Sequence, residues 1–455
     1  MTDKPRAAAL ELLRAVREDD AYANLVMSSI VQGFGLSGRD AAFATELGYG
    51  TLRWSGWYDA VLTECLSRPL EKVEPVLLDI LRLGVHQILA MRVPDHAAVD
   101  SSCDLARASG APSAATARAG FVNGVLRCVA RADADEREVR LQGQRSDSDI
   151  EWLAQRWSHP AWIVRAFKDA LAAGGEADSR SDELAEVLRA DNVPTKPVLV
   201  ARSMPIDQLL ALPEVRPGRW SPVAAELIDG PPEALACVRD GSVGVQDEGS
   251  QLVTLALVRA PVDGPDRLWL DLCAGPGGKA ALLDAEARRV GAHVIAVEQH
   301  EHRAELVRSA LPADSVTEVI AGDARHRPWG DVLADRVLVD APCSGLGALR
   351  RRPESRWRRT PADLAALGPL QRDLLRTAVD SVRPGGVVAY VTCSPHLAET
   401  QFVVDDVLRG RSDLIQVDAR EFLPEVTDCG EGLAVQLWPH RHGTDGMFLA
   451  LIRKA

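Results

Sequence analysis

Two cysteines in short polar turns are the residues of this chain best suited to covalent chemistry. Cys343 lies in the hexapeptide DAPCSG (340–345), and Cys393 lies in TCSP (392–395). Each turn follows an apolar stretch typical of a strand, so both thiols are expected where strands end. A cysteine thiolate can add to carbon 6 of a pyrimidine ring and turn the ring into an enamine, whose carbon 5 then attacks a sulfonium methyl group. A single cysteine is more often a buried, inert thiol, but a pair in turns rich in Pro, Ser or Thr favours function.

Asp340 provides a carboxyl group beside the first of these cysteines. It ends an apolar strand, so its side chain is expected to point into the crevice. A carboxyl hydrogen-bonded to N3 of the ring would stabilise the charge that develops during thiolate addition. After methyl transfer the proton on carbon 5 has to be removed and the enzyme thiol has to leave, a step that a second thiol would assist. Catalytic roles are therefore predicted for Cys343, Cys393 and Asp340.

A glycine-rich turn, DLCAGPGGK (271–279), precedes both cysteines. Its glycines let backbone N–H groups approach a ligand at the start of a helix. It departs from a phosphate-binding P-loop, because Cys273 replaces the first glycine and Ala280 replaces the final Ser or Thr. The dinucleotide fingerprint Gly-x-Gly-x-x-Gly matches weakly, with Ala280 at its last position. A purely structural turn between a strand and a helix is the remaining alternative.

Two acidic residues after the next strands suit a cofactor that contains ribose and adenine. Glu298 ends the next predicted strand, about 20 residues past the turn, where an acid binds ribose hydroxyls. Asp323 follows the third strand and could hydrogen-bond an adenine amino group, with a helix N-cap as its alternative role. This placement suits S-adenosylmethionine as well as a dinucleotide.

Arginines concentrate directly after the Cys343 turn. Residues 350–359 contain six arginines around Trp357, with Glu354 as the only acid, in a chain whose formal charge is −13. A solvated helix face is the alternative, but the position beside the expected crevice favours contacts with nucleic-acid phosphates. The target base is expected in a loop or flipped out, because the ring is attacked from its face. The predicted RNA-binding residues are Arg350, Arg351, Arg352 and Arg356.

Alternating strand and helix patterns in the second half predict the elements that position these residues. Apolar runs at 268–272, 294–297, 337–339 and 387–391, separated by helical stretches such as 364–379, indicate a parallel sheet with crossover helices. Ligands of such sheets bind at the carboxyl ends of the strands. Residues 1 to about 130 show only helical spacing. We therefore predict an α/β protein with a helical domain (1–135), a charged linker or exposed helix (131–149), a small α+β RNA-binding subdomain (150–240) and a domain that carries the chemistry (241–455).

Composition narrows the functional classes. Of 455 residues, 46% are hydrophobic and 26% charged, as in globular proteins, and 52 basic against 65 acidic residues argue against an indiscriminate polyanion binder. The eight cysteines form no Cys-x-x-Cys pair and no metal-ligand spacing, which favours a reducing compartment. No apolar run approaches the ~18 residues of a membrane span. We expect a cytoplasmic protein with no metal and no membrane partner.

The motifs together resemble those of the RNA 5-methylcytosine methyltransferases of the NOL/NOP/Sun family. The resemblance covers roughly residues 241–455 and includes the three turns as well as GVQDEGS (244–250) and DGMF (445–448). The N-terminal half is similar to the NusB-like helical domain of the bacterial Sun/Fmu (RsmB) branch of that family. Two positions depart from the family pattern: Gly275 replaces a usual Ala, and Thr400 replaces a usual Asn.

This resemblance implies a class I Rossmann-like methyltransferase domain that methylates carbon 5 of a cytosine in 16S ribosomal RNA. On the family's pattern Cys393 is the nucleophile, and Cys343 is the thiol that helps release the product. The expected substrate is naked RNA or a partly assembled small subunit, bound by a monomer. The implied S-adenosyl-L-methionine site consists of Cys273, Ala274, Gly275, Pro276, Gly277, Gly278, Lys279, Glu298, Asp323 and Asp340.

Several alternatives remain open from the sequence. DNA cytosine methyltransferases use a Pro-Cys cysteine as nucleophile, which would exchange the roles of Cys343 and Cys393. Transfer RNA is a second possible substrate. The chain could also be a catalytically silent RNA-binding assembly factor, against which the intact thiol pair, Lys279 and Asp340 argue. A dinucleotide oxidoreductase rests on the glycine-rich turn alone and explains neither cysteine.

Overall fold

The computed structural model describes residues 3–174 and 180–455, and the chain divides into two compact units. The first, called the helical unit below, comprises Met1–Arg165, Asp191–Val193 and Leu349–Arg358. The second, called the sheet unit, comprises Ala166–Ala190, Pro194–Ala348 and Arg359–Ala455. Residues 150–240 fall partly in each of the two units, and their organisation as a separate subdomain stays a prediction. Their predicted RNA-binding role stays a prediction.

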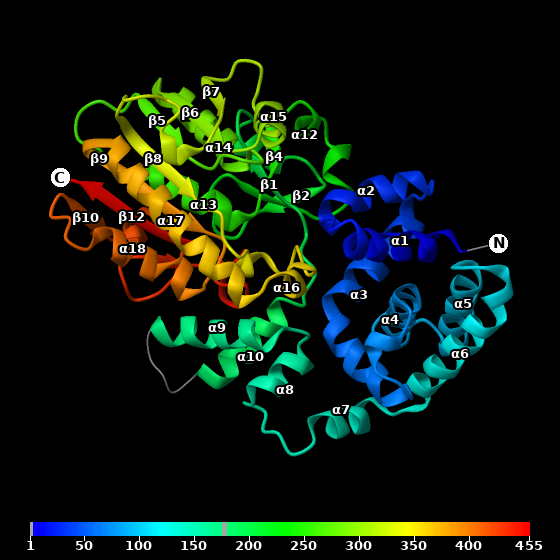
Figure 1. The fold of residues 1–455 in the computed structure, drawn as a ribbon. Coiled ribbons are helices and arrows are strands. Elements are labelled where there is room, and N and C mark those ends of the chain that lie inside the picture. The colour runs from blue at the N-terminus through cyan, green and yellow to red at the C-terminus, as the bar shows by residue number, and fades with distance from the viewer. Residues whose placement is uncertain (1–2, 175–179) are drawn as a thin grey trace. The chain divides into compact units, whose positions relative to one another are not determined.

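The helical unit confirms the all-helical interpretation of the first part of the chain. Apolar residues at helical spacing form its core, and Ile80, Leu83 and Val122 among them are fully buried. The α1 helix begins where the Asp3 carboxylate accepts the Arg6 N–H at 3.2 Å, as an N-cap does. The helices are α1 (Lys4–Glu18), α2 (Ala23–Gly33), α3 (Gly38–Cys65), α4 (Pro75–Leu89), α5 (Asp95–Ala108), α6 (Ala115–Arg131), α7 (Ala134–Gln142), α8 (Ile150–Arg156) and the short α16 (Ser355–Arg358) (Figure 1).

A disulfide joins two helices of this unit. Cys65 at the end of α3 bonds to Cys128 in α6, with Cα atoms 5.8 Å apart. The sequence instead suggests a chain of reduced cysteines. The difference arises because the two cysteines are 63 positions apart and meet only when the helices pack, which no local spacing reveals.

A small antiparallel sheet opens the sheet unit. Its strand order is β2-β3-β1-β4. Because β4 comes from beyond residue 240, this sheet crosses the predicted boundary at 241. The strands are β1 (Val198–Ala201), β2 (Val215–Pro217), β3 (Ala224–Leu227) and β4 (Val243–Val245), and the helices before and between them are α9 (Ala161–Ala173), α10 (Arg180–Ala190), α11 (Ile206–Leu210) and α12 (Ala236–Arg239).

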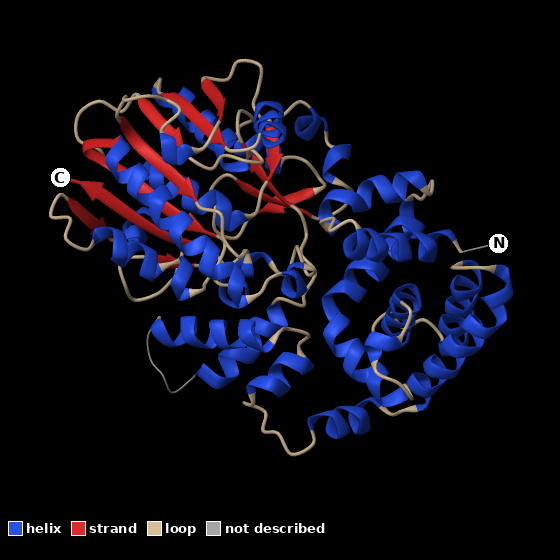
Figure 2. Ribbon diagram, in the orientation of Figure 1, coloured by secondary structure: helices blue, strands red, loops and turns tan. Residues whose placement is uncertain are grey.

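The large sheet has the order β10-β12-β9-β8-β5-β6-β7, with β11 paired to β12. The strands from β5 to β9 are mutually parallel, and β12 is antiparallel to β9. This confirms the predicted Rossmann-like α/β fold, drawn with strands in red in Figure 2. The strands are β5 (Leu268–Asp271), β6 (His293–Glu298), β7 (Thr317–Ala321), β8 (Ala334–Asp340), β9 (Val382–Thr392), β10 (Leu414–Val417), β11 (Val435–Gln436) and β12 (Phe448–Lys454).

Helices cover both faces of this sheet, and side chains that alternate along each strand fill the two layers. Trp269 and Leu338 pack on the side of α13 and α14, whereas Leu270 and Val339 pack on the side of α17. Within the described residues, no helix is both long enough and apolar enough to cross a membrane. The helices of this region are α13 (Glu248–Arg259), α14 (Gly278–Val290), α15 (Glu301–Ala310), α17 (Pro361–Ser381), α18 (Gln401–Leu408) and α19 (Pro439–His442).

The strand order changes direction at β5. The chain continues from β5 to β6 and β7 on one side and returns to β8 and β9 on the other. The carboxyl ends of β5 and β8 therefore lie together at a topological switch point, where open α/β sheets bind ligands. These ends carry the glycine-rich turn and Asp340.

Candidate active site

The two thiols lie at the carboxyl ends of neighbouring parallel strands. The pairing of β8 with β9 extends to Asp340 and Val391, so the turns that follow leave the sheet side by side. The Sγ atoms of Cys343 and Cys393 are 3.4 Å apart, and both residues are partly exposed. The structure therefore brings together two thiols that belong to separate sequence motifs.

The contact between the thiols makes the two sulfurs unequal. A hydrogen bond from the Cys343 S–H lowers the pKa of Cys393 despite its burial, and the Lys279 ammonium acts in the same direction. The pKa of Cys343 is raised well above its ordinary value by this hydrogen bond and by burial. A thiolate at Cys393 beside a thiol at Cys343 is the arrangement that attack by Cys393 requires.

An ion pair adjoins the thiols. Lys279, in the first turn of α14, places its Nζ atom 2.7 Å from Asp340 Oδ2. Burial opposes the charged form of this lysine, but the Asp340 carboxylate outweighs burial and raises the pKa of Lys279. The sequence resemblance assigns Lys279 to the cofactor site, and the structure directs its ammonium to a predicted catalytic carboxyl. Both charges of the pair act on the pKa of Cys393, which Asp340 raises and Lys279 lowers.

The glycine-rich turn connects β5 to α14 and lies against Glu298. Gly277 has a φ of 109°, and a Cβ there would lie 2.7 Å from Ala310 Cβ, so only glycine fits. The Gly275 N–H donates to Glu298 Oε2 at 3.1 Å, and a Cβ on Gly275 would lie 2.2 Å from that oxygen. Glycine in place of the usual Ala thus leaves room for the carboxylate at the end of β6.

Buried polar groups beside this turn fit a polar ligand. Gln246 is 6% exposed, and neither the nitrogen nor the oxygen of its side-chain amide has a hydrogen-bond partner among the described residues. A Cβ on Gly278 would lie 3.9 Å from the Gln246 Cδ. Asp271 Oδ2 also lacks a partner within the described chain, while burial and then the Asp340 charge raise the pKa of Asp271 to about 7. Unpaired polar atoms at a helix N-terminus favour a ligand that satisfies them. Sequence reasoning misses Gln246, although it lies within GVQDEGS.

Other members of the predicted cofactor site occupy different environments. Burial raises the pKa of the Cys273 thiol, so this cysteine is not suited to attack. Asp323 follows β7 and caps a 3-10 turn by accepting the Arg325 N–H at 3.0 Å. The guanidinium of Arg325 lowers the pKa of Asp323. The N-cap role is therefore present in the structure, and the contact with adenine stays a prediction.

A buried carboxylate that sequence reasoning misses joins the two cysteine turns. Glu399 accepts hydrogen bonds from the hydroxyls of Ser344 and Ser394, the residues that follow the two cysteines. Thr400, which stands where the family usually has Asn, is buried and donates its hydroxyl to His396 O at 3.0 Å. The Cys393 loop is thus supported by Thr400 itself. A serine directly after each cysteine is the only sequence signal for this connection.

The arginine-rich segment is built into the helical unit. Arg356 is fully buried, and its guanidinium takes part in four hydrogen bonds of 2.7–3.1 Å. The acceptors are the backbone oxygens of Arg53, Ser158 and Asp191 and the side-chain oxygen of Asn192. Arg356 therefore holds together three remote segments of the helical unit, and the predicted phosphate contact through this residue is corrected to an interior structural role.

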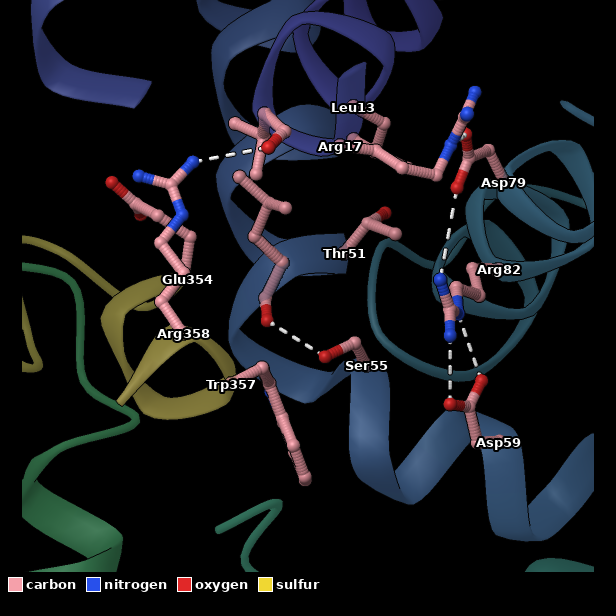
Figure 3. Close-up of a pocket in the computed structure, with 12 residues that line it drawn as sticks. Leu13, Arg17, Thr51, Ser55, Asp59, Asp79, Arg82, Glu354, Trp357 and Arg358 are labelled. Atoms are coloured by element: carbon pink, nitrogen blue, oxygen red, sulfur yellow. Dashed lines mark hydrogen bonds and ion pairs between the residues drawn. The ribbon is translucent and has the colours of Figure 1, made fainter. Parts of the chain in front are cut away.

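The neighbouring arginines differ in exposure. Arg350 is only 7% exposed, so it too is corrected from a phosphate contact to a largely interior position, whereas Arg351 and Arg352 are exposed. Glu354 accepts the N–H of Ala23, the first residue of α2, at 3.0 Å. Figure 3 shows Glu354 together with Trp357 and Arg358 around a cavity of about 380 Å³ inside the helical unit. Some charged side chains of this segment are therefore buried in the helical unit, and others are exposed.

Replacing Arg356 by Ala should lower the free energy of unfolding of the helical unit by about 2–4 kcal/mol, because four buried acceptors lose their donor. Chemical denaturation followed by circular dichroism measures this change. Arg351→Ala, at an exposed position of the same segment, is the matched control and should change stability by less than about 0.5 kcal/mol. Equal stability of Arg356→Ala and the wild type would contradict the interior role.

Comparison with known proteins agrees with this architecture. A family model described as 16S rRNA methyltransferase RsmB/F matches residues 256–453, and a NusB family model matches residues 3–131. A protein of Mycobacterium tuberculosis named as a methyltransferase is 50% identical, covering 99% of this chain and 97% of the relative. The ribosomal RNA small subunit methyltransferase B of Yersinia enterocolitica is 30% identical and covers 94% of each chain.

Solved structures share the fold. The crystal structure of PH0851 has a TM-score of 0.80 at 22% identity and covers 100% of this chain and 99% of that chain. A methyltransferase homolog protein from Pyrococcus horikoshii has a TM-score of 0.53 at 21% identity, covering 67% of this chain and 99% of that one. With its RsmB/F methyltransferase and NusB domains, and with full-length relatives at 30% identity or more, this chain belongs to the RsmB (Sun) family of ribosomal RNA methyltransferases, whose methyl donor is S-adenosyl-L-methionine.

Proposed function

We propose that this protein methylates carbon 5 of a cytosine in 16S ribosomal RNA, through a transient bond between Cys393 Sγ and carbon 6 of the ring. The observation that carries the proposal is the pair of thiols 3.4 Å apart, with the charges of the Lys279–Asp340 ion pair acting on Cys393. Addition of a thiolate to carbon 6 is the established way to make carbon 5 nucleophilic, and this site holds a thiol with a lowered pKa.

The first step forms the bond from Cys393 Sγ to carbon 6 and moves the electrons of the carbon 5–carbon 6 double bond into the ring. The proton that the Lys279 ammonium shares with the Asp340 carboxylate can pass through Asp340 to N3, which neutralises the charge that develops there. When bound at the glycine-rich turn, S-adenosyl-L-methionine supplies the electrophilic methyl group that carbon 5 takes up. Gln246 and Glu298 are the side chains best placed to hold it, because they adjoin that turn.

The second step restores the aromatic ring. A base removes the proton from carbon 5, its electron pair re-forms the double bond, and the bond to Cys393 Sγ breaks. The Cys343 S–H lies within hydrogen-bond reach of Cys393 Sγ and can stabilise the departing thiolate. Its raised pKa keeps the proton on Cys343 at neutral pH, as this role requires.

We further propose that the exposed arginines of the 349–358 segment contact RNA phosphates. Arg351 and Arg352 are exposed, and the Arg352 guanidinium lies 5.4 Å from the centre of the Tyr22 ring, which limits its freedom. Replacing both by Ala should weaken RNA binding and reduce the slope of log K against log salt by about 0.7 for each phosphate that is no longer neutralised. Filter binding at several salt concentrations measures both quantities.

A matched control for that experiment is Arg107→Ala, which removes an exposed arginine of the helical unit that is paired with Asp104. It should leave RNA affinity unchanged, and binding of S-adenosyl-L-methionine should persist in every variant. Unchanged RNA affinity in the double variant would refute the phosphate contacts.

The proposed function is tested by methyl transfer from labelled S-adenosyl-L-methionine to unmodified 16S transcript, to partly assembled small subunits and to transfer RNA, with bisulfite mapping of the product. Transfer to carbon 5 of one ribosomal cytosine is the expected result. Methylation of transfer RNA alone would change the substrate, and absence of transfer to any RNA would leave a silent assembly factor. We expect a monomer that acts in the cytoplasm, where the ribosomal substrate is made.

A further inference from the structure

Glu399 stands out as a buried charge that the proposed reaction does not use directly. It ends the 3-10 turn Leu397–Glu399 before α18 and is 1% exposed. Its Oε1 accepts the Ser344 N–H at 2.7 Å and the Gln371 side-chain N–H at 3.3 Å. Its Oε2 accepts the hydroxyls of Ser344 at 2.5 Å and of Ser394 at 2.7 Å. Both N–H donors point to Oε1 and both serine hydroxyls to Oε2, so each oxygen of the carboxyl group is held by two hydrogen bonds.

The position of these donors in the chain matters as much as their number. Ser344 directly follows Cys343, and Ser394 directly follows Cys393. The two serine hydroxyls are themselves 3.2 Å apart. A single carboxylate therefore fixes the residue after each thiol, and with it the spacing of the two turns.

Two further hydrogen bonds restrict the position of Glu399 and of the Cys343 turn. The Tyr390 hydroxyl donates to the backbone oxygen of Glu399 at 2.9 Å. Gln371, in α17, also donates to Pro342 O at 2.8 Å, which fixes the residue before Cys343. Both partners are fully buried, and their hydrogen bonds leave the glutamate little freedom to move.

We propose that Glu399 is a positioning residue whose carboxylate sets the spacing of the two thiols and favours a thiol at Cys343 beside a thiolate at Cys393. The negative charge of Glu399 is one of the causes of the raised pKa of Cys343, after the hydrogen bond with Cys393 and burial. Its consequence for methyl transfer rests on the proposed function.

The test replaces Glu399 by Gln, which keeps the shape of the side chain but removes its charge and one acceptor. The rate at which iodoacetamide alkylates each cysteine is measured by mass spectrometry at a series of pH values. This measurement gives the pH at which each thiol ionises and needs neither RNA nor methyl donor. In the wild type, alkylation of Cys393 should begin at a lower pH than alkylation of Cys343. In Glu399→Gln the two profiles should move toward one another by about one pH unit in total, and kcat should fall roughly 100-fold with the KM for S-adenosyl-L-methionine unchanged.

Two further variants keep the result interpretable. Ser394→Ala removes one donor and no charge, so it should lower kcat while the Cys343 profile stays in place, even if Glu399→Gln folds poorly. Glu421→Gln, at an exposed position of the sheet unit, should behave as the wild type.

Two outcomes would overturn the assignment: cysteine profiles in Glu399→Gln that remain as far apart as in the wild type, or a Ser394→Ala variant with wild-type kcat. Because alkylation needs no substrate, an absence of cytosine methylation by the wild type would defeat the proposed function alone and leave the assignment of Glu399 to be decided by the profiles.

Discussion

Replacing Cys393 by Ala is expected to lower kcat for methyl transfer by roughly 10⁴- to 10⁶-fold and to abolish covalent capture of RNA that contains 5-fluorocytosine. The fluorine on carbon 5 cannot leave as a proton does, so a competent enzyme stays bonded to carbon 6. Cys343 lies 3.4 Å away but is not expected to take over, because burial still raises its pKa when the hydrogen bond with Cys393 is lost. Denaturing gels of the protein with fluorinated and ordinary RNA measure the adduct directly.

The partner variant separates attack from release. Cys343→Ala should still attack, although at higher pH, because Cys393 loses the hydrogen bond that lowers its pKa. Its adduct should accumulate on ordinary cytosine, because the departing Cys393 sulfur loses the same donor. Cys237→Ala, which removes a buried thiol from the core around the small sheet, is the matched control and should form and release adducts as the wild type does. Loss of the adduct in Cys343→Ala together with its retention in Cys393→Ala would exchange the two roles.

Much of this site is predictable because it depends on strand ends. The apolar runs that become β5, β6, β8 and β9 are short, continuous and separated by helical stretches, which is the pattern of buried parallel strands. Parallel strands bring their carboxyl ends to one edge of a sheet. Cys343, Cys393 and Glu298 could therefore be expected near one another from their places in the sequence alone.

The features of the structure that the sequence does not predict depend on contacts between segments that are far apart in the chain. Six arginines in ten residues indicate a solvated or phosphate-binding surface by composition, yet Arg356 finds carbonyl acceptors on segments at Arg53, Ser158 and Asp191 and is buried by them. The role of Glu399 cannot be predicted from the sequence either, because a glutamate before a helix is common. Only the structure shows that Ser344 and Ser394 both hydrogen-bond to its carboxyl group. Buried polar networks are specified by tertiary structure, so sequence reasoning that relies on periodicity misses them.

Replacing Lys279 by Met is expected to lower kcat by roughly 10²- to 10³-fold, because the site loses the cation that faces the developing charge. Methionine keeps much of the length of the side chain but leaves Asp340 without its ion-pair partner at 2.7 Å. The ammonium also lowers the pKa of Cys393, so its removal raises that pKa. The acidic limb of the pH profile of kcat/KM, on which activity rises as Cys393 ionises, should therefore move to higher pH. Steady-state methyl transfer measured from about pH 6 to about pH 9 detects both effects.

Controls for this variant distinguish charge from position. Lys196→Met removes a lysine whose side chain is 54% exposed in the sheet unit and should leave kcat and the pH profile unchanged. Lys279→Arg keeps a positive charge, so the acidic limb should return toward its original pH. Its kcat should stay low, because a planar guanidinium cannot direct a donor to Asp340 Oδ2 as a compact ammonium does. Wild-type kcat in Lys279→Met would mean that the ion pair is structural and that Asp340 stabilises the ring without it.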